Sequence, residues 1–283
     1  MADLDAFAGR YFELLPTGDH QSLPAAPGVR FTENGQELAL GRGLWRTATG
    51  AAGIRAMTLA DPERHQVVTW GMAREADDID VILGLRLRVD DELITEIETL
   101  VYRPGNTRLL NVANLSRPTP GFLDPIPAKA DRPSREELLN AANGYLDGVS
   151  GAGADVIPVA DGTIRIENGV QTVLNPEGKG LEPGQQVNEA MKVGVAEQVR
   201  QGMTRHIEAA RERRCFLTDT ERGLVFVNFF FDHAGKVRGW PGRAAMPTPN
   251  SMAVWEVFKV SGGQIRHIEA IISTFPYGMR SGW

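Results

Sequence analysis

The sequence contains a single cysteine, Cys215, among 283 residues, which excludes an internal disulfide and a cysteine-rich zinc site. It also lacks a basic block longer than the Arg213-Arg214 pair, and 30 Lys and Arg against 36 Asp and Glu give a net charge of -6. Phosphate neutralisation needs a basic surface, so we do not expect nucleic acid as a partner.

Long apolar runs are missing as well. The longest mostly apolar stretch, Leu224 to Phe231, is interrupted by Asn228 and is far shorter than the roughly 20 residues that span a bilayer. The first residues are acidic where a secretory signal would be basic. With 42% hydrophobic and 23% charged residues, the composition is that of a soluble globular protein, which we expect in the cytoplasm without a membrane partner.

Motifs for bound groups are absent too. The five histidines include no HxH or HxxxH pair, so no metal site is predicted. No phosphate-cradling loop or dinucleotide fingerprint is present, and we expect no nucleotide cofactor.

The chain does contain an internal repeat. Tyr11 precedes Glu33-Asn34-Gly35 by 22 residues, and Tyr145 precedes Glu167-Asn168-Gly169 by the same distance. Two further blocks recur in the same order: 59–64 resembles 217–222, and 93–98 resembles 264–269. Four blocks in one order predict two copies of one domain, each with its own core.

A proline-rich segment separates the copies. It predicts a first domain at 1–103, a linker at 104–133 and a second domain at 134–283. Apolar residues in this segment, Phe122 and Ile126 among them, suggest that it packs along the domains. The offset between the copies grows by 24 residues, and helical spacing of Val187, Met191 and Val195 predicts an inserted helix within 185–213.

Each copy begins with a helix and continues with strands. Apolar residues at helical spacing predict the first helix up to Pro16, and Ser134-Arg135-Glu136-Glu137 is a capping box that begins the second. The Asn-Gly dipeptides predict type I′ turns. Long alternating runs follow, and the pattern as a whole indicates an α+β domain in which a curved antiparallel sheet wraps around N-terminal helices.

This order of elements resembles the NTF2-like superfamily, which includes ketosteroid isomerase and SnoaL-type polyketide cyclases. The tandem arrangement resembles an uncharacterised microbial family built from two such domains. Four strings carry the resemblance: 31–38 (FTENGQEL), 43–48 (GLWRTA), 219–223 (DTERG) and 276–283 (PYGMRSGW). It implies two tandem cone domains, and it implies enzymes that need no cofactor and place a carboxylate, histidine or tyrosine in an apolar pocket.

The recurring residues are the first candidates for a site. Tyr11 and Tyr145 are either core tyrosines or hydroxyls that reach the pocket. Glu33 and Glu167 either cap the Asn-Gly turn or serve as pocket acids, with Arg165 as a charge partner in the second copy.

The last strand and its neighbours supply further candidates. His267 and Glu269 alternate onto one face and are either a base with its orienting partner or a solvated stripe. Asn228 lies within an apolar strand and needs hydrogen-bond partners there. His206, near the end of the inserted helix, is either a site residue or a solvated helix-end histidine.

We therefore predict catalysis in the second copy, by His267, Glu269, His206, Tyr145 and Asn228. Substrate binding is assigned to Tyr11, Glu33, Trp45, Trp70, Arg165, Glu167 and Trp255, because indole rings suit an aromatic ligand. The expected enzyme is a cofactor-independent lyase or isomerase acting by general acid–base catalysis on a small hydrophobic, aromatic molecule. The alternative is a non-catalytic module that binds a hydrophobic ligand or forms homo-oligomers.

Overall fold

The computed structural model of the protein describes residues 3–76, 79–104, 111–126, 128–237 and 248–283. The chain divides into two compact units. The first unit comprises Met1–Arg108, Val112–Leu123 and Arg280–Trp283, and the second comprises Leu109–Asn111 and Asp124–Met279. The last four residues, predicted to lie in the second domain, thus belong to the first unit.

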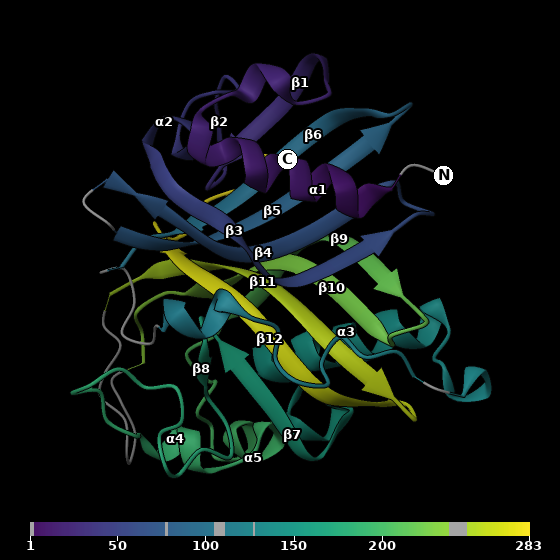
Figure 1. Ribbon diagram of the computed structural model, residues 1–283. Helices are drawn as coiled ribbons and strands as arrows, with labels where there is room; N and C mark the ends of the chain where they lie inside the picture. Colours follow the sequence, from purple (N-terminus) through teal and green to yellow (C-terminus); the bar gives the residue numbers. More distant parts are fainter. Residues whose placement is uncertain (1–2, 77–78, 105–110, 127, 238–247) are drawn as a thin grey trace. The chain divides into compact units, whose positions relative to one another are not determined.

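The first unit combines a helix with a six-stranded sheet in the order β2-β1-β6-β5-β4-β3. Its helix α1 packs against β3, β4 and β5 (Figure 1). The elements are α1 (Leu4–Leu14), β1 (Ala25–Glu33), β2 (Gln36–Glu37), α2 (Leu44–Thr47), β3 (Ala48–Asp61), β4 (Gln66–Glu75), β5 (Ile79–Asp90) and β6 (Leu93–Tyr102).

The second unit repeats this plan, with the sheet order β8-β7-β12-β11-β10-β9. Helix α3 packs against β9, β10 and β11 (Figure 1). The elements are α3 (Arg135–Asp147), β7 (Val159–Glu167), β8 (Val170–Gln171), α4 (Glu189–Lys192), α5 (Val195–Arg200), β9 (Ala209–Asp219), β10 (Leu224–His233), β11 (Asn250–Ser261) and β12 (Gln264–Phe275). The predicted fold class, two tandem α+β domains in which a sheet packs on an N-terminal helix, is confirmed.

One detail of the predicted sheets requires correction, because they are mixed and not wholly antiparallel. Strands β3 to β6 and β9 to β12 are antiparallel neighbours, but β1 runs parallel to β6, and β7 runs parallel to β12. Tight hairpins force an antiparallel arrangement on consecutive strands. No hairpin joins β1 to β6 or β7 to β12, so their relative direction is not fixed locally.

Side chains cap the first turn of both helices. The Asp3 side chain accepts a hydrogen bond from the Ala6 N–H at the start of α1. In α3 the Ser134 and Glu137 side chains cap each other's backbone N–H groups, which confirms the capping box. None of the described helices is long and apolar enough to cross a membrane.

The two Asn-Gly turns also have the predicted geometry. Asn34 and Gly35 both have positive φ, at 52° and 77°, and Asn168 and Gly169 follow the same pattern at 48° and 81°. Two consecutive left-handed residues define a type I′ turn. Each asparagine side chain also binds the last strand of its own sheet, since Asn34 Oδ1 accepts from the Val101 N–H at 2.8 Å.

The inserted segment differs from its prediction. A single helix within 185–213 is expected, but the structure has the short helices α4 and α5, and β9 already begins at Ala209. Gly194 is the N-cap of α5, and Gly202 follows that helix with a φ of 71°. Glycine disfavours a continuous helix, so the apolar spacing here spans two helices.

The proline-rich segment lies partly with each unit. Leu115 and Phe122 are buried in the part that belongs to the first unit. Ile126 is buried in the second unit, where its N–H donates to the Glu221 carbonyl. Residues 105–110 and 127 of the predicted linker lie outside the described residues.

The C-terminal Trp283 docks on the first unit. Its indole N–H donates to Thr32 Oγ1 at 2.9 Å, and the guanidinium carbons of Arg30 and Arg86 lie 4.3 Å and 4.7 Å from the centre of a Trp283 ring. Arg30 also donates to the Gly282 carbonyl. The chain therefore begins and ends in the same unit.

Candidate functional site

The two faces of each sheet carry different residues. We call the face that packs on α1 or α3 the inner face and the opposite one the outer face. On β11 the core residues Val254 and Phe258 lie on the inner face. Because side chains alternate along a strand, Glu256 lies between them on the same face. Glu256 is only 2% exposed, so a carboxyl group is buried inside the apolar core of the second unit.

Tyr145 of α3 brings a hydroxyl to this carboxyl. Its ring packs on Phe258, with centroids 4.9 Å apart, and its hydroxyl is hydrogen-bonded to Glu256. Among the described residues, Glu256 Oε2 is a buried oxygen with no hydrogen-bond partner. One oxygen of the acid is therefore left for another group.

Arg165 of β7 continues the chain of hydrogen bonds. Its Nη1 donates to the Tyr145 hydroxyl at 3.3 Å, and its Nη2 donates to Gln198 Oε1 at 2.8 Å. Its Nε donates to Thr172 Oγ1 at 2.9 Å and lies 3.3 Å from Glu167 Oε1. The guanidinium is thus paired with one carboxylate and held by three neutral partners.

Burial controls the protonation of this cluster. Desolvation and then the charge of Glu167 raise the pKa of Glu256 to about 8, against an ordinary value of 4.5, while Arg165 and Tyr145 act in the opposite direction. Burial likewise raises the pKa of Tyr145 far above its ordinary range. At pH 7 Glu256 is therefore mostly a neutral acid, and with Arg165 paired to Glu167 the cluster is close to electroneutral.

The first unit has apolar residues at the corresponding positions. In the first sheet, Leu85 pairs with Thr99, and Thr99 pairs with Glu33. In the second sheet, Glu256 pairs with Ala270, and Ala270 pairs with Glu167. Leu85 therefore occupies the position that corresponds to Glu256. By the same register, Phe31 corresponds to Arg165, since Phe31 pairs with Ile97 and Arg165 with Ile268. At these two equivalent positions, the second unit has an acid and a guanidinium where the first unit has Leu85 and Phe31.

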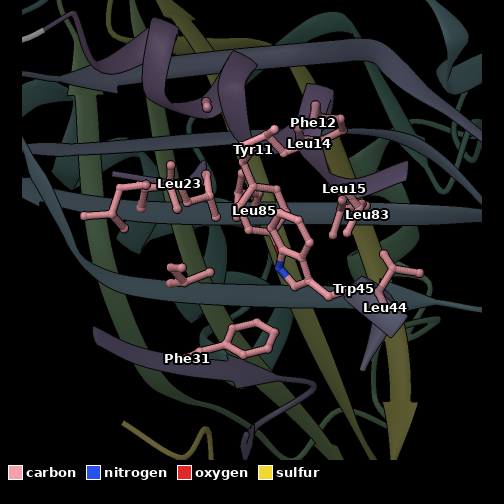
Figure 2. Close-up of a cluster of buried hydrophobic side chains, with 14 of the residues drawn as sticks. Tyr11, Phe12, Leu14, Leu15, Leu23, Phe31, Leu44, Trp45, Leu83 and Leu85 are labelled. Atoms are coloured by element: carbon pink, nitrogen blue, oxygen red, sulfur yellow. The ribbon is translucent and has the colours of Figure 1, made fainter. Parts of the chain in front are cut away.

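Trp45 fills the interior of the first unit. It is 3% exposed, and its ring centroid lies 4.8 Å from that of Tyr11. Figure 2 shows Tyr11, Trp45, Leu85 and Phe31 gathered in one cluster. The predicted binding residues Tyr11 and Trp45 are therefore brought together, as core side chains.

Glu33 lies at the edge of that cluster. Its Oε2 accepts the Leu44 N–H at 2.7 Å, and Arg103 lies 3.6 Å from its Oε1. Burial raises the pKa of Glu33, and the hydrogen bond from Leu44 and the charge of Arg103 partly offset this. The carboxyl group holds the start of α2, a structural role that differs from the expected capping of the Asn-Gly turn.

Several predicted residues lie on the outer faces. Strand alternation places Asn228, Trp255, His267 and Glu269 on the face of the second sheet opposite Tyr145, and Trp70 on the outer face of the first sheet. His267 Nε2 lies 3.4 Å from Glu269 Oε1, so this predicted pair does meet. It cannot share a pocket with Tyr145, because the sheet separates them.

His206 lies apart from the Glu256 cluster. It is buried, and its ring packs edge-on against His233 at a centroid distance of 5.5 Å. The structure does not bring His206 to Tyr145, Arg165 or Glu256. Among the parts of the chain described, no group of three or more His, Cys, Asp or Glu side chains is arranged to hold a metal ion.

An open groove of about 470 Å³ lies along α5 and the start of β7. Ile157 and Val195 line it and also belong to the inner-face core with Tyr145 and Phe258. Glu256, Tyr145 and Arg165 are not among its lining residues. The groove is therefore adjacent to the core that holds the acid but does not open onto it.

Sequence reasoning missed Glu256 and Gln198. A signal for Glu256 exists, since it interrupts the apolar positions Met252, Val254 and Phe258 at a spacing of two. Gln198 has no such signal, because its burial depends on how α5 packs. Tyr145, Arg165 and Glu167, which the sequence did identify, are brought together with these two residues.

Residues 131–272, half of the chain, match the family model described as "Domain of unknown function (DUF8021)". A search of the curated proteins finds no match. Among solved structures, the chain is similar to a SnoaL-like polyketide cyclase from Agrobacterium tumefaciens, at 14% identity over 48% of this chain and 91% of that one, with a TM-score of 0.31. It is also similar to an LEH-like epoxide hydrolase from M. tuberculosis (13% identity, 50% and 86% covered, TM-score 0.32) and to AusH from Aspergillus nidulans (8% identity, 50% and 86% covered, TM-score 0.32).

Proposed function

The chain belongs to the DUF8021 family, whose match covers most of the second unit, and we propose that the interior of this unit is the active site of a cofactor-independent acid–base enzyme. The observation that carries the proposal is the buried acid Glu256, which replaces the Leu85 of the first unit and hydrogen-bonds to Tyr145. A carboxyl group kept neutral at pH 7 is a proton donor that water-exposed carboxylates cannot match.

In the proposed reaction Glu256 is the general acid. Its Oε2 donates a proton to an oxygen of the substrate as negative charge develops there. The carboxylate that forms on Glu256 is stabilised by the Tyr145 hydroxyl, which Arg165 in turn polarises. Proton transfer of this kind needs only these side chains, which is why the proposal includes no cofactor.

Glu167 is the proposed base. It is ion-paired with Arg165 and its side chain is 22% exposed, so it is the better hydrated carboxylate of the two. When both groups lie in one site, the carboxylate can accept a proton from a substrate carbon, and the neutral acid can donate a proton to a substrate oxygen in the same cycle. That combination suits isomerisation or elimination next to a carbonyl group.

The substrate proposed is a small, mainly apolar molecule with a carbonyl or hydroxyl oxygen. The acid is surrounded by apolar inner-face side chains, including Val227, Phe229, Val254 and Phe258. Such a lining favours an aromatic or polycyclic body by burial of apolar surface. Isomerase or lyase chemistry on an aromatic compound remains the specific form of the proposal.

A non-catalytic role is proposed for the first unit alone. Its interior is occupied by Phe31, Trp45 and Leu85, and the buried carboxyl of Glu33 binds the backbone of α2. At the positions of Glu256 and Arg165 the first unit has Leu85 and Phe31, which can neither donate nor accept a proton. We therefore assign the first unit a stabilising function.

The proposal is tested by a thermal-shift screen of aromatic and terpenoid carbonyl compounds, followed by turnover assays on the hits. We expect Glu256→Gln to lower turnover by about 10²- to 10⁴-fold, the usual contribution of a general acid. Glu269→Gln, a matched change at a buried carboxyl on the outer face of the same sheet, is the control.

Loss of turnover in Glu269→Gln with full activity in Glu256→Gln would overturn the proposal. It would favour the predicted pair His267 and Glu269, whose participation in catalysis stays a prediction. Unchanged turnover in both variants, with both folded, would exclude either carboxyl as the acid.

A further inference from the structure

Gln198 links the inserted segment to the proposed site. It lies on α5, which belongs to the insertion predicted to be specific to the second copy, and it is 3% exposed. Neighbouring residues of α5, Glu197 and Arg200, line the open groove instead. Gln198 is therefore the residue of this short helix whose polar side chain reaches the Glu256 cluster.

The hydrogen bonds of Gln198 fix the orientation of its amide. Its Nε2 donates to the carbonyls of Thr172 at 3.0 Å and Ala190 at 2.6 Å. Both N–H groups are thereby used, so Oε1 must point the other way, where it accepts from Arg165 Nη2 at 2.8 Å. The side chain is a rigid acceptor, held by one carbonyl that precedes the insertion and by one within it.

Arg165 depends on such an acceptor for its position. A guanidinium is planar, and its hydrogen-bond partners determine the direction of every N–H group. Thr172 and Gln198 hold two of its nitrogens, and this leaves Nη1 directed at the Tyr145 hydroxyl. Without the Gln198 acceptor, the planar guanidinium of Arg165 would be free to rotate away from Tyr145.

We propose that Gln198 is a positioning residue that orients Arg165 toward Tyr145 and Glu256, and so makes the inserted segment part of the proposed active site. This inference rests on the proposed function for its catalytic meaning, but its structural content can be measured without a substrate. The insertion then explains how the second copy holds a buried cation that the first copy, with Phe31 at the same place, does not need.

The test compares Gln198→Met with Gln201→Met. Methionine has a similar volume and removes both the acceptor and the donors of the side chain. Gln201 is the control because it is exposed at the end of α5 and its side-chain amide donates to Glu197 Oε1. Two readouts are followed: hydrogen exchange of the Arg165 side-chain N–H groups by NMR, and the midpoint of the Glu256 carboxyl titration by infrared spectroscopy, assigned with Glu256→Gln.

In Gln198→Met we expect the Arg165 N–H groups to exchange about five- to tenfold faster, as loss of one hydrogen bond allows. We also expect the Glu256 midpoint to move upward, because Arg165 normally lowers it. Gln201→Met should match the wild type in both readouts. A folded Gln198→Met protein with wild-type exchange and midpoint would overturn the inference.

Gln198→Leu decides the question if Gln198→Met does not fold. It removes the acceptor with a smaller side chain, so faster exchange of the Arg165 N–H groups is expected, and wild-type exchange would contradict the proposal. Failure of the proposed function would give a different result. Full turnover in Glu256→Gln would show that the site is not catalytic, while the Gln198 variants would still change the exchange of the Arg165 N–H groups.

Discussion

Glu256 and Leu85 occupy equivalent positions in the two sheets, opposite Ala270 and Thr99 on the adjacent last strands. Both lie on the inner face, next to the tyrosine of the opening helix. The duplicated fold therefore contains one apolar and one acidic version of the same position. This contrast lets the effects of the acid be separated from those of the architecture.

The buried acid should make stability depend on pH. The fold raises the pKa of Glu256 from an ordinary value of 4.5 to about 8, so it favours the protonated form. Its contribution is fully present below about pH 4.5 and is lost as the pH rises through 8. We expect the free energy of unfolding of the wild type to fall by a few kcal/mol more than that of Glu256→Gln between pH 5 and pH 9, as measured by urea denaturation. Parallel curves for the two proteins would show that Glu256 titrates normally.

The residues of the first unit can be transferred to the second. Arg165→Phe and Glu256→Leu, singly and together, form a double-mutant cycle. At pH 6 Glu256 is neutral and the coupling energy should be small, whereas at pH 9 the ionised carboxylate attracts Arg165 and the coupling should reach roughly 1–3 kcal/mol. Urea denaturation of the four proteins at both pH values measures it. Equal coupling at the two pH values would contradict the assigned protonation.

The two equivalent tyrosines should differ in function. Tyr145→Phe removes the hydrogen bond that lowers the pKa of Glu256, so the Glu256 titration midpoint should rise. Turnover on a substrate found by screening should fall by about 10²-fold, as for loss of one preorganised donor. Tyr11→Phe, the same change in the first unit, should affect neither quantity. Infrared titration and turnover assays check both expectations, and equal effects of the two variants would sink the assignment.

The C-terminal tryptophan should stabilise the first unit. Trp283→Ala removes stacking on Arg30 and Arg86 and the hydrogen bond to Thr32. Each cation–π contact contributes about 0.5–2 kcal/mol, so we expect a destabilisation of roughly 1–3 kcal/mol in chemical denaturation. Trp283→Phe, which keeps a ring but not the donor, should lie between that variant and the wild type. No change in Trp283→Ala would show that the tail is not bound in solution.

The sequence by itself determined the features that depend on neighbouring residues. The capping box at Ser134 and Glu137, the two Asn-Gly turns and the repeat of strand-forming blocks all act over a few positions, and each is present in the structure. Local energetics decide such features before any tertiary contact forms. The tandem fold follows from them.

Only the tertiary structure decided which residues meet. Both faces of β11 are mostly apolar, with Val254 and Phe258 on one and Trp255 and Val257 on the other, so alternation could not say which face would hold the helix. Glu256 meets Tyr145 and Arg165 because α3, β7 and β11 pack around one core, although β11 is far from the other two elements in the sequence. His267 and Glu269 lie two residues apart on β12, yet the sheet separates them from that core, because side chains on opposite faces of a strand cannot reach a common pocket.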